Sequence, residues 1–256
     1  MRLVKAYWNW LRNSVNAHGI HSPFLFLMYN EVVRPKKKLA PNFKAEQLRN
    51  ALLKDQNYIE NIDLGAGSKK NKGDKIQISQ IAKHALKPKK QAQFIARLVQ
   101  FIQPKTIIEL GTSLGISTIY MANAAPHSEI HTIEGNPHIR NIAIENFKKA
   151  GFVNIISHEG NFDDILPKIL TNKEIDLWFI DGNHTYEATL RYFEMAMNSK
   201  KDNLCILFDD IYWSEGMQKA WEEICAKPEV SLSLDLFHLG IIFKKSSLTK
   251  EHYYIR

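Results

Sequence analysis

The chain is poor in cysteine and contains no long apolar run. Its 256 residues include two cysteines, Cys205 and Cys225, without Cys-x-x-Cys spacing, which argues against a disulfide framework and against a zinc site. The longest apolar stretches, such as 24–28 and 177–180, are far shorter than the roughly 20 residues that span a bilayer. No signal-peptide pattern follows Met1. We therefore expect a cytoplasmic protein without a transmembrane segment.

The charge of the chain is unevenly distributed. Residues 1–90 carry 18 Lys and Arg against 6 Asp and Glu, a net charge of +12, whereas residues 91–256 carry 16 against 21, a net charge of −5. A basic segment can attract nucleic acid, an anionic lipid surface or an acidic substrate. Because arginine is sparse in this segment, a solvated lysine-rich surface is the favoured interpretation.

The sequence pattern changes near Pro88 and predicts two parts, residues 1–90 and 91–256. The first part contains short helical pieces broken by prolines and by a Gly/Lys-rich stretch. The second part predicts strands that alternate with helices, one of which begins at Asn136-Pro137 and ends at Gly151. The predicted strands are 106–110, 129–134, 153–158, 175–181, 204–209, 231–237 and 240–244.

This alternation predicts the α/β class. Runs such as 177–180 and 205–208 are apolar without a period of two, as in parallel strands that are buried on both faces. Only His238 and Leu239 separate the last two strands, too few residues for a crossover helix. We therefore expect a Rossmann-like, doubly wound, seven-stranded sheet, mostly parallel with a terminal antiparallel hairpin, and an N-terminal helical extension.

Acidic residues follow the predicted strands. Glu109, Glu134, Asp181 and the pair Asp209-Asp210 each end an apolar run. Open α/β sheets bind ligands outside the carboxyl ends of their strands. A carboxylate at such a position is costly unless it binds something, so these residues predict a ligand site.

The turn that follows the first predicted strand contains two glycines. Gly111 permits the tight turn, Gly115 permits close approach of the next helix, and the amides of that helix can receive a carboxylate. Ser113 replaces the middle glycine of the dinucleotide fingerprint, which favours a ligand with an amino-acid group over a pyrophosphate. Glu134 ends the second strand, where an acid can bind ribose hydroxyls.

A second glycine-rich loop, 63–68, has a weaker context. A short polar run precedes it and a lysine-rich stretch, rather than a helix, follows it. We interpret this loop as a lid or substrate contact rather than as the main ligand site.

The ordered series Glu109-x-Gly111-x-x-x-Gly115-x-Ser117, Thr132-Ile133-Glu134, Gly160-Asn161, Phe179-Ile180-Asp181 and Phe208-Asp209-Asp210 resembles the class I S-adenosylmethionine-dependent methyltransferases. The most similar branch is the metal-dependent, catechol O-methyltransferase-like one, and the resemblance covers roughly residues 91–245. In that family the first strand end holds the methionine portion of the cofactor, the second binds ribose and the third flanks adenine. The implied cofactor-binding residues are Glu109, Gly111, Thr112, Ser113, Gly115, Ser117, Glu134, Gly160, Asn161 and Asp181.

The resemblance also implies a divalent cation, Mg²⁺, held by Asp181, Asp209 and Asp210. The family often has Asp-Asn at the last pair, so Asp-Asp is a departure, although it still offers only oxygen ligands. Asp181 and His184 are the expected catalytic residues. His184 lies where the catechol enzymes carry a lysine base and can accept the proton of the acceptor. The alternative is that His184 caps a helix that starts at Thr185 or contacts the cofactor.

The resemblance therefore implies O-methylation of a small molecule. An RNA methyltransferase that uses the basic N-terminal segment is one alternative, although Asp181-Gly182-Asn183-His184 lacks the Asn/Asp-Pro-Pro-aromatic turn of enzymes that modify bases. A non-catalytic cofactor-binding module is another, since fold does not fix function.

Two N-terminal features have less specific interpretations. His18 and His21 flank a turn without an evident third metal ligand, which favours a structural turn over a substrate contact. Tyr7, Trp8, Trp10 and Leu11 form an aromatic helical stripe. We expect this stripe to pack on the core or on another subunit of a homodimer rather than on a membrane surface.

Overall fold

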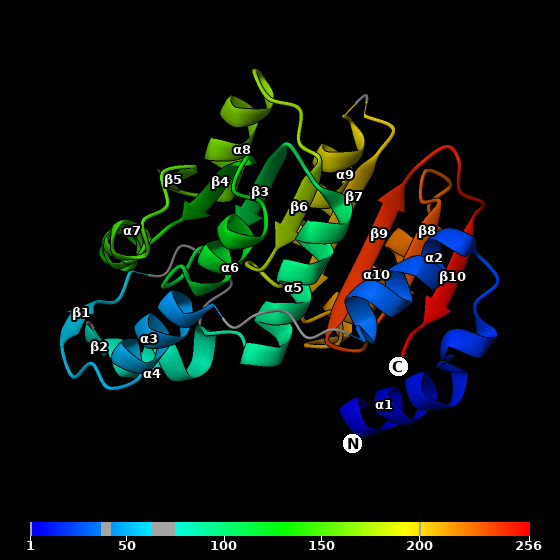
Figure 1. Ribbon diagram of the computed structural model, residues 1–256, viewed down its shortest axis with the longest axis horizontal. Coiled ribbons are helices and arrows are strands. Elements are labelled where there is room, and N and C mark those ends of the chain that lie inside the picture. The colour runs from blue at the N-terminus through cyan, green and yellow to red at the C-terminus, as the bar shows by residue number, and fades with distance from the viewer. Residues whose placement is uncertain (1, 37–41, 63–74, 200) are drawn as a thin grey trace. The chain divides into compact units, whose positions relative to one another are not determined.

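The computed structural model describes residues 2–36, 42–62, 75–199 and 201–256 (Figure 1). Contacts between residues divide the chain into two compact units. The terminal unit comprises Met1–Lys36 and Glu174–Arg256, and the central unit comprises Lys37–Lys173. The glycine-rich loop 63–68 lies outside the described residues.

The central unit contains a parallel three-stranded ladder in the order β3-β4-β5. Its strands are β3 (Thr106–Leu110), β4 (Glu129–Glu134) and β5 (Ile155–Glu159). A separate antiparallel pair joins β1 (Tyr58–Glu60) and β2 (Lys75–Gln77). Its helices are α3 (Phe43–Leu52), α4 (Ile78–Ala85), α5 (Lys89–Ile102), α6 (Ile116–Ala124), α7 (Pro137–Ala150) and α8 (Phe162–Leu170).

Buried apolar side chains from α3 to α7 form one core cluster of the central unit. Helix α6 is buried on most of its surface, and Ile119 is 0% exposed. Helix α7 has the predicted ends: the side chain of Asn136 accepts hydrogen bonds from the amides of His138 and Ile139, and Gly151 ends the helix with φ of 81°. This cluster fixes α6 and α7 beside the turn that follows β3.

The terminal unit contains five strands in the order β6-β7-β9-β8-β10. They are β6 (Leu177–Ile180), β7 (Leu204–Asp209), β8 (Leu232–Asp235), β9 (Leu239–Lys244) and β10 (Glu251–Tyr254). Strands β6 and β7 are parallel, β9 is antiparallel to both β7 and β8, and β10 is parallel to β8.

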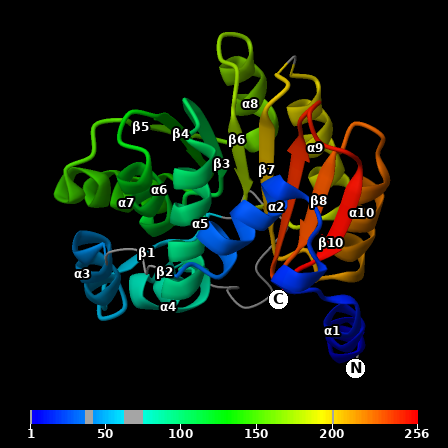
Figure 2. The same ribbon diagram turned by 45° about the vertical axis from the view of Figure 1, so that its right-hand side comes forward.

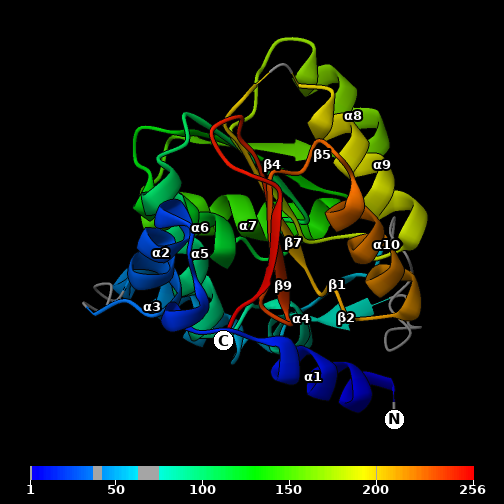
Figure 3. The ribbon, with the colours of Figure 1, turned by 90° about the vertical axis from the view of Figure 1, so that its right-hand side faces the viewer.

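Helices cover both faces of the strands of the terminal unit. Figure 3 shows α9 (Tyr186–Met197) and α10 (Glu215–Ala226) on one side and α2 (Pro23–Met28) on the other. The short helix η1 (Ala17–Gly19) precedes α2, and the π-helix η2 (Tyr29–Val33) continues it. Helix α1 (Arg2–Asn13) contacts β10 at the end of the unit where the chain terminates (Figure 2).

The predicted α/β class, with a mostly parallel sheet and a β8–β9 hairpin, is confirmed. The bounds of β3, β4 and β7 match the predicted ranges. Two elements were not predicted: the β1–β2 pair in the N-terminal segment, and β10, which pairs with β8 in the terminal unit. Both involve short, partly polar segments that lack an apolar run. The division near residue 90 stays a prediction.

The aromatic stripe of α1 divides between two environments. Trp10 is buried, as predicted, and its ring lies 5.7 Å from that of Phe237. Trp8 is 59% exposed, so the stripe packs on this chain only in part, and packing on another subunit stays a prediction. Among the described residues, no helix combines the length and apolarity that a membrane span requires.

Gly115 provides a test of the packing beside the β3 turn. A Cβ atom at this position would lie 2.5 Å from Cε1 of Phe147, and its φ of 80° disfavours L side chains. We expect Gly115→Ala to lower the free energy of unfolding by about 2–4 kcal/mol in urea denaturation. Gly216→Ala is the control, because its Cβ would meet Tyr186 at an ordinary 3.4 Å. Equal stabilities of the two variants would contradict this description of the turn.

Candidate functional site

The carboxylate of Glu109 is the most buried acidic group at the strand ends of the central unit. The residue is 0% exposed and lies in β3. Three hydroxyls donate hydrogen bonds to its carboxylate: Ser117 at 2.8 Å, Thr118 at 2.5 Å and Thr132 at 2.6 Å. Ser117 and Thr118 come from the first turn of α6 and Thr132 from β4. Glu109 therefore ties the glycine turn, α6 and β4 together.

Burial raises the pKa of Glu109 to about 7, because desolvation disfavours the charged carboxylate. The hydrogen bonds from Thr118, Thr132 and Ser117 oppose this shift. A cationic ligand group would stabilise the ionised form. Glu109 is thus suited to bind a cation near neutral pH.

The turn between β3 and α6 is held in an unusual backbone conformation. Gly111, Ser113 and Gly115 have φ values of 100°, 47° and 80°. The amides of Gly111 and Thr112 donate to the carbonyl oxygen of Ile133 at 3.0 and 3.2 Å. Among the described residues, the buried Oγ of Ser113 has no hydrogen-bond partner. A ligand with a hydrogen-bonding group would satisfy this atom.

Glu134 lies beside the same turn. One carboxylate oxygen accepts from the amide of Ser113 at 2.9 Å, and the other accepts from the amide of Asn136 at 3.0 Å. The amide of Gly160 donates to the carbonyl oxygen of Glu134 at 3.1 Å, and Asn161 caps α8. The central unit therefore brings together nine of the predicted cofactor-binding residues at the carboxyl ends of its three parallel strands.

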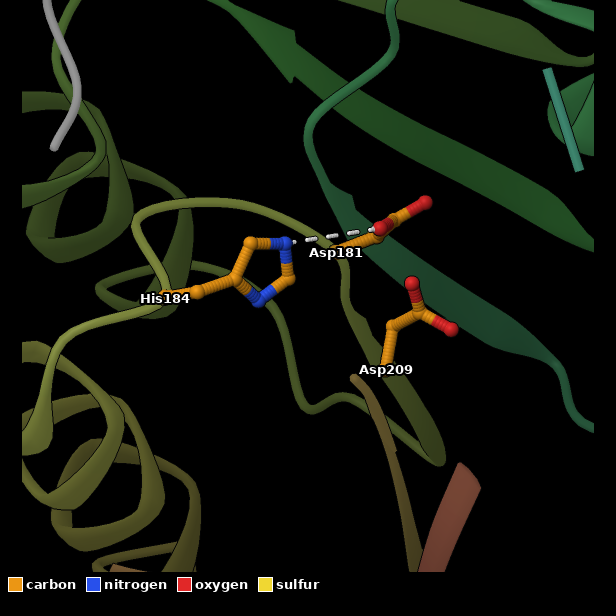
Figure 4. Close-up of side chains that lie close together, drawn as sticks. All are labelled: Asp181, His184 and Asp209. Carbon is orange, nitrogen blue, oxygen red and sulfur yellow. Dashed lines mark ion pairs between the residues drawn. The ribbon is translucent and has the colours of Figure 1, made fainter. Parts of the chain in front are cut away.

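A second cluster lies in the terminal unit. Asp181, His184 and Asp209 each offer a ligand atom within 4.8 Å of the others, and Figure 4 shows the three side chains converging. Nε2 of His184 lies 3.9 Å from Oδ1 of Asp181. The parallel register pairs Ile180 with Phe208, so the aspartates follow at the same edge.

The turn after β6 orients His184. Asn183 has φ of 51°, and its amide side chain donates to the hydroxyl of Tyr192 at 3.1 Å. The N-cap of α9 is Thr185, whose hydroxyl accepts from the amide of Ala188. The alternative that His184 caps this helix was therefore wrong. Its imidazole is directed to Asp181 instead.

Asp210 is not a member of the described three-residue cluster. Its φ is 53°, and its amide donates to the carbonyl oxygen of His238 at 2.9 Å. The terminal unit thus places two of the three predicted cation ligands, Asp181 and Asp209, together with the predicted base. His18 and His21 also lie outside this cluster.

Asp235 is a supporting residue that the sequence analysis missed. It is 0% exposed, and its carboxylate accepts hydrogen bonds from Tyr212 Oη at 2.8 Å, Trp221 Nε1 at 3.0 Å and the amide of Phe237 at 2.8 Å. Its carbonyl oxygen accepts from Trp10 Nε1 at 3.0 Å. Asp235 therefore fixes the segment after Asp209 against β8, α10 and α1. Its position, an acid at the end of an apolar strand, is the signal that was available.

Comparison with known proteins identifies the region that contains both clusters. Residues 108–211 match the model of a family described as a methyltransferase domain. This region is therefore similar to that methyltransferase family. The class I, catechol O-methyltransferase-like resemblance seen in the sequence is confirmed.

Two relatives of the methyltransferase region are catechol O-methyltransferases. The one from Niastella koreensis is 32% identical over 125 residues, which cover 47% of this chain and 56% of the relative. The one from Mycobacterium tuberculosis is 30% identical over 129 residues, which cover 50% of this chain and 57% of the relative. The chain thus spans only about half the length of these relatives.

Solved structures support the fold. An O-methyltransferase from Bacillus cereus in complex with SAH superposes with a TM-score of 0.60 and 21% identity, covering 85% of this chain and 96% of that one. The O-methyltransferase TomG from Streptomyces achromogenes, in complex with SAM, gives a TM-score of 0.57 and 19% identity, covering 63% and 82%. At these identities the similarity shows the fold alone.

Substitution of Asp235 tests its supporting role. Asp235→Asn replaces an acceptor with an NH₂ donor that faces other donors, so we expect the free energy of unfolding to fall by about 2–4 kcal/mol. Tyr212→Phe removes only one of the hydrogen bonds and should lower it by about 1 kcal/mol. Chemical denaturation of both variants measures the difference. A loss for Asp235→Asn no larger than that for Tyr212→Phe would exclude the supporting role.

Proposed function

We propose that this protein is an S-adenosylmethionine-dependent O-methyltransferase that acts on a small molecule with the assistance of a divalent cation. The observation that carries the proposal is the buried Glu109 carboxylate, held by three hydroxyls at a glycine turn within a methyltransferase-family region. The catechol O-methyltransferases among its relatives favour a hydroxyl acceptor.

The central unit has groups that fit the cofactor. The raised pKa of Glu109, about 7, suits a carboxylate that awaits the cationic amino group of the methionine portion. The unpartnered Oγ of Ser113 and the half-buried backbone of Gly111 offer contacts to the same portion, and Gly115 shapes the turn that holds them. We assign ribose binding to Glu134 and contacts to adenine to Gly160 and Asn161.

The terminal unit has groups that fit a divalent cation. Carboxylate oxygens of Asp181 and Asp209 suit Mg²⁺, while imidazole coordination would favour a softer ion. We assign Asp181 and Asp209 as ligands of the cation. Asp210 is a neighbouring acid that contacts the cation directly or through a bound water. A cation bound there would lower the pKa of an acceptor hydroxyl.

The chain itself contributes orientation and proton acceptance. S-adenosylmethionine supplies an electrophilic methyl group when bound. Glu109 and Glu134 orient the cofactor by its amino-acid and ribose ends, which limits the directions in which an acceptor can approach. His184 accepts the hydroxyl proton on its imidazole, the side-chain group that serves most often as a general base. In this scheme Asp181 orients the imidazole that lies 3.9 Å away.

The role of Glu109 predicts a pH dependence of cofactor binding. A cationic amino group favours ionised Glu109, so binding lowers the pKa of this carboxyl from about 7 and releases a proton. Affinity for S-adenosylhomocysteine should therefore rise roughly tenfold from pH 5.5 to pH 7. Isothermal titration calorimetry in buffers of different ionisation enthalpy measures both effects.

Glu109→Gln is the matched control for this titration. It keeps the size of the side chain but removes its ionisation, so its binding should be weaker and should not change with pH in this window. Proton release that persists unchanged in Glu109→Gln would exclude Glu109 as the linked group.

Three substitutions separate the roles of the terminal cluster. Asp209→Asn should weaken Mn²⁺ binding, measured by electron paramagnetic resonance, by about tenfold or more. His184→Gln should leave this affinity within about twofold and lower kcat by about 10²-fold, because a base contributes to turnover. Glu194→Gln on the exposed side of α9 is the control and should change neither.

The cation role also predicts the behaviour of the chelated protein. Exhaustive chelation should abolish methyl transfer to a catechol, and Mg²⁺ should restore it. Full turnover in chelator would remove the metal from the proposal, while a large loss of Mn²⁺ affinity in His184→Gln would make His184 a ligand instead of the base.

The alternatives of an RNA acceptor and of a non-catalytic module make different predictions. An RNA methyltransferase should bind RNA with an affinity that falls steeply with salt. A non-catalytic module should bind S-adenosylmethionine without consuming it in the presence of any acceptor.

A further inference from the structure

Helix α1 presents an exposed apolar strip. Four of its side chains are exposed: Leu3 at 51%, Val4 at 61%, Tyr7 at 42% and Trp8 at 59%. An exposed tryptophan beside other exposed apolar side chains is unusual on a protein surface and marks an interaction site.

The orientation of α1 is fixed by contacts on its other side. Trp10 packs on Phe237 and donates to the carbonyl oxygen of Asp235. At the start of the helix, the guanidinium of Arg2 donates to the carbonyl oxygens of Tyr212 and Trp213 at 2.9 and 3.2 Å. These contacts hold the helix to the terminal unit, so the exposed strip is a fixed feature of the unit.

Val4, Trp8 and Leu11 follow one another at helical spacing and form the outer edge of the apolar side of α1. Lys5 lies three residues before Trp8 and Arg12 four residues after it, so both are neighbours of Trp8 on the helix surface. A tryptophan between an apolar strip and basic residues is typical of helices that lie in a membrane interface.

The charge of this segment favours an anionic partner. Residues 1–30 contain Arg2, Lys5 and Arg12 but no aspartate or glutamate. A symmetric contact between two copies of α1 would bring these like charges together, which is unfavourable. An anionic lipid surface offers both the apolar layer for Trp8 and the negative charge for Lys5 and Arg12.

We propose that α1 binds the surface of anionic membranes, with Val4 and Trp8 at the boundary between headgroups and acyl chains and with Lys5 and Arg12 at the lipid phosphates. The helix lies on the bilayer and does not cross it. This inference rests on the exposed side chains of α1 and is independent of the proposed methyl transfer.

Co-sedimentation of the full chain with vesicles tests the proposal. Binding is compared between vesicles of phosphatidylcholine alone and vesicles in which about one third of the lipid is phosphatidylglycerol. We expect binding to the anionic vesicles that weakens as salt increases. The double variant Val4→Ser/Trp8→Ser should reduce the partition coefficient by about tenfold or more, because it removes the inserted side chains.

A matched pair of charge variants distinguishes the contribution of α1 to vesicle binding from the contribution of the net charge. Lys5→Glu/Arg12→Glu and Lys89→Glu/Lys90→Glu change the net charge equally, and Lys89 and Lys90 are exposed in the central unit. Each basic residue near an anionic surface raises the partition coefficient roughly fivefold. The partition coefficient of the α1 variant should therefore fall by more than about 25-fold, and that of the α5 variant only slightly. Circular dichroism and thermal unfolding check that each variant is folded.

Other outcomes would overturn the proposal. Equal losses for the two charge variants would mean that vesicles attract the protein by its net charge alone. Absence of binding to anionic vesicles at low salt would exclude the membrane. Sedimentation equilibrium that shows a dimer in the wild type and a monomer in Val4→Ser/Trp8→Ser, without vesicle binding, would identify a second copy as the partner.

Discussion

The burial of one carboxylate organises the candidate site of the central unit. Glu109 is completely buried, and hydroxyls from α6 and β4 donate hydrogen bonds to its carboxylate. Removing an ionised carboxylate from water costs free energy. This cost raises the pKa of Glu109 to about 7. Such an arrangement is retained most readily where a ligand cation offsets that cost. The glycine turn, the amide contacts of Glu134 and the packing of α6 all position this one group.

The terminal unit also contains a completely buried carboxylate, that of Asp235. This buried acid accepts three hydrogen bonds and thereby connects β8 to the segment after β7, to α10 and to the β8–β9 turn. The same residue accepts from Trp10 through its carbonyl oxygen. The cluster of Asp181, His184 and Asp209 and the exposed strip of α1 therefore belong to one tightly connected unit.

Much of this organisation could be predicted from the sequence. Apolar runs that end in an acid predicted the positions of β3, β4, β6 and β7. A short, continuous apolar run of this kind is typical of a parallel strand that is buried on both faces. The same acids then identified the candidate site. The caps of α7 at Asn136 and Gly151 followed from local side-chain chemistry.

Other features depend on contacts between residues far apart in the sequence. Asp235 could not be distinguished from a solvated strand-end acid, because its donors Tyr212 and Trp221 come from other elements. The exposure of Trp8 and the burial of Trp10 differ although the residues are neighbours in one stripe, since Trp10 packs on Phe237 and donates to the carbonyl oxygen of Asp235. The short strand β10 pairs with β8 through its backbone, and its sequence contains no apolar run from which the strand could have been predicted.

We have proposed that Glu109 and its glycine turn bind the amino-acid end of the cofactor. A crystal structure of the protein grown with S-adenosylhomocysteine would show this contact. We expect the amino group of the ligand at the Glu109 turn and its ribose hydroxyls on Glu134. Density for the ligand at any other position, with the Glu109 turn filled only by water, would contradict it.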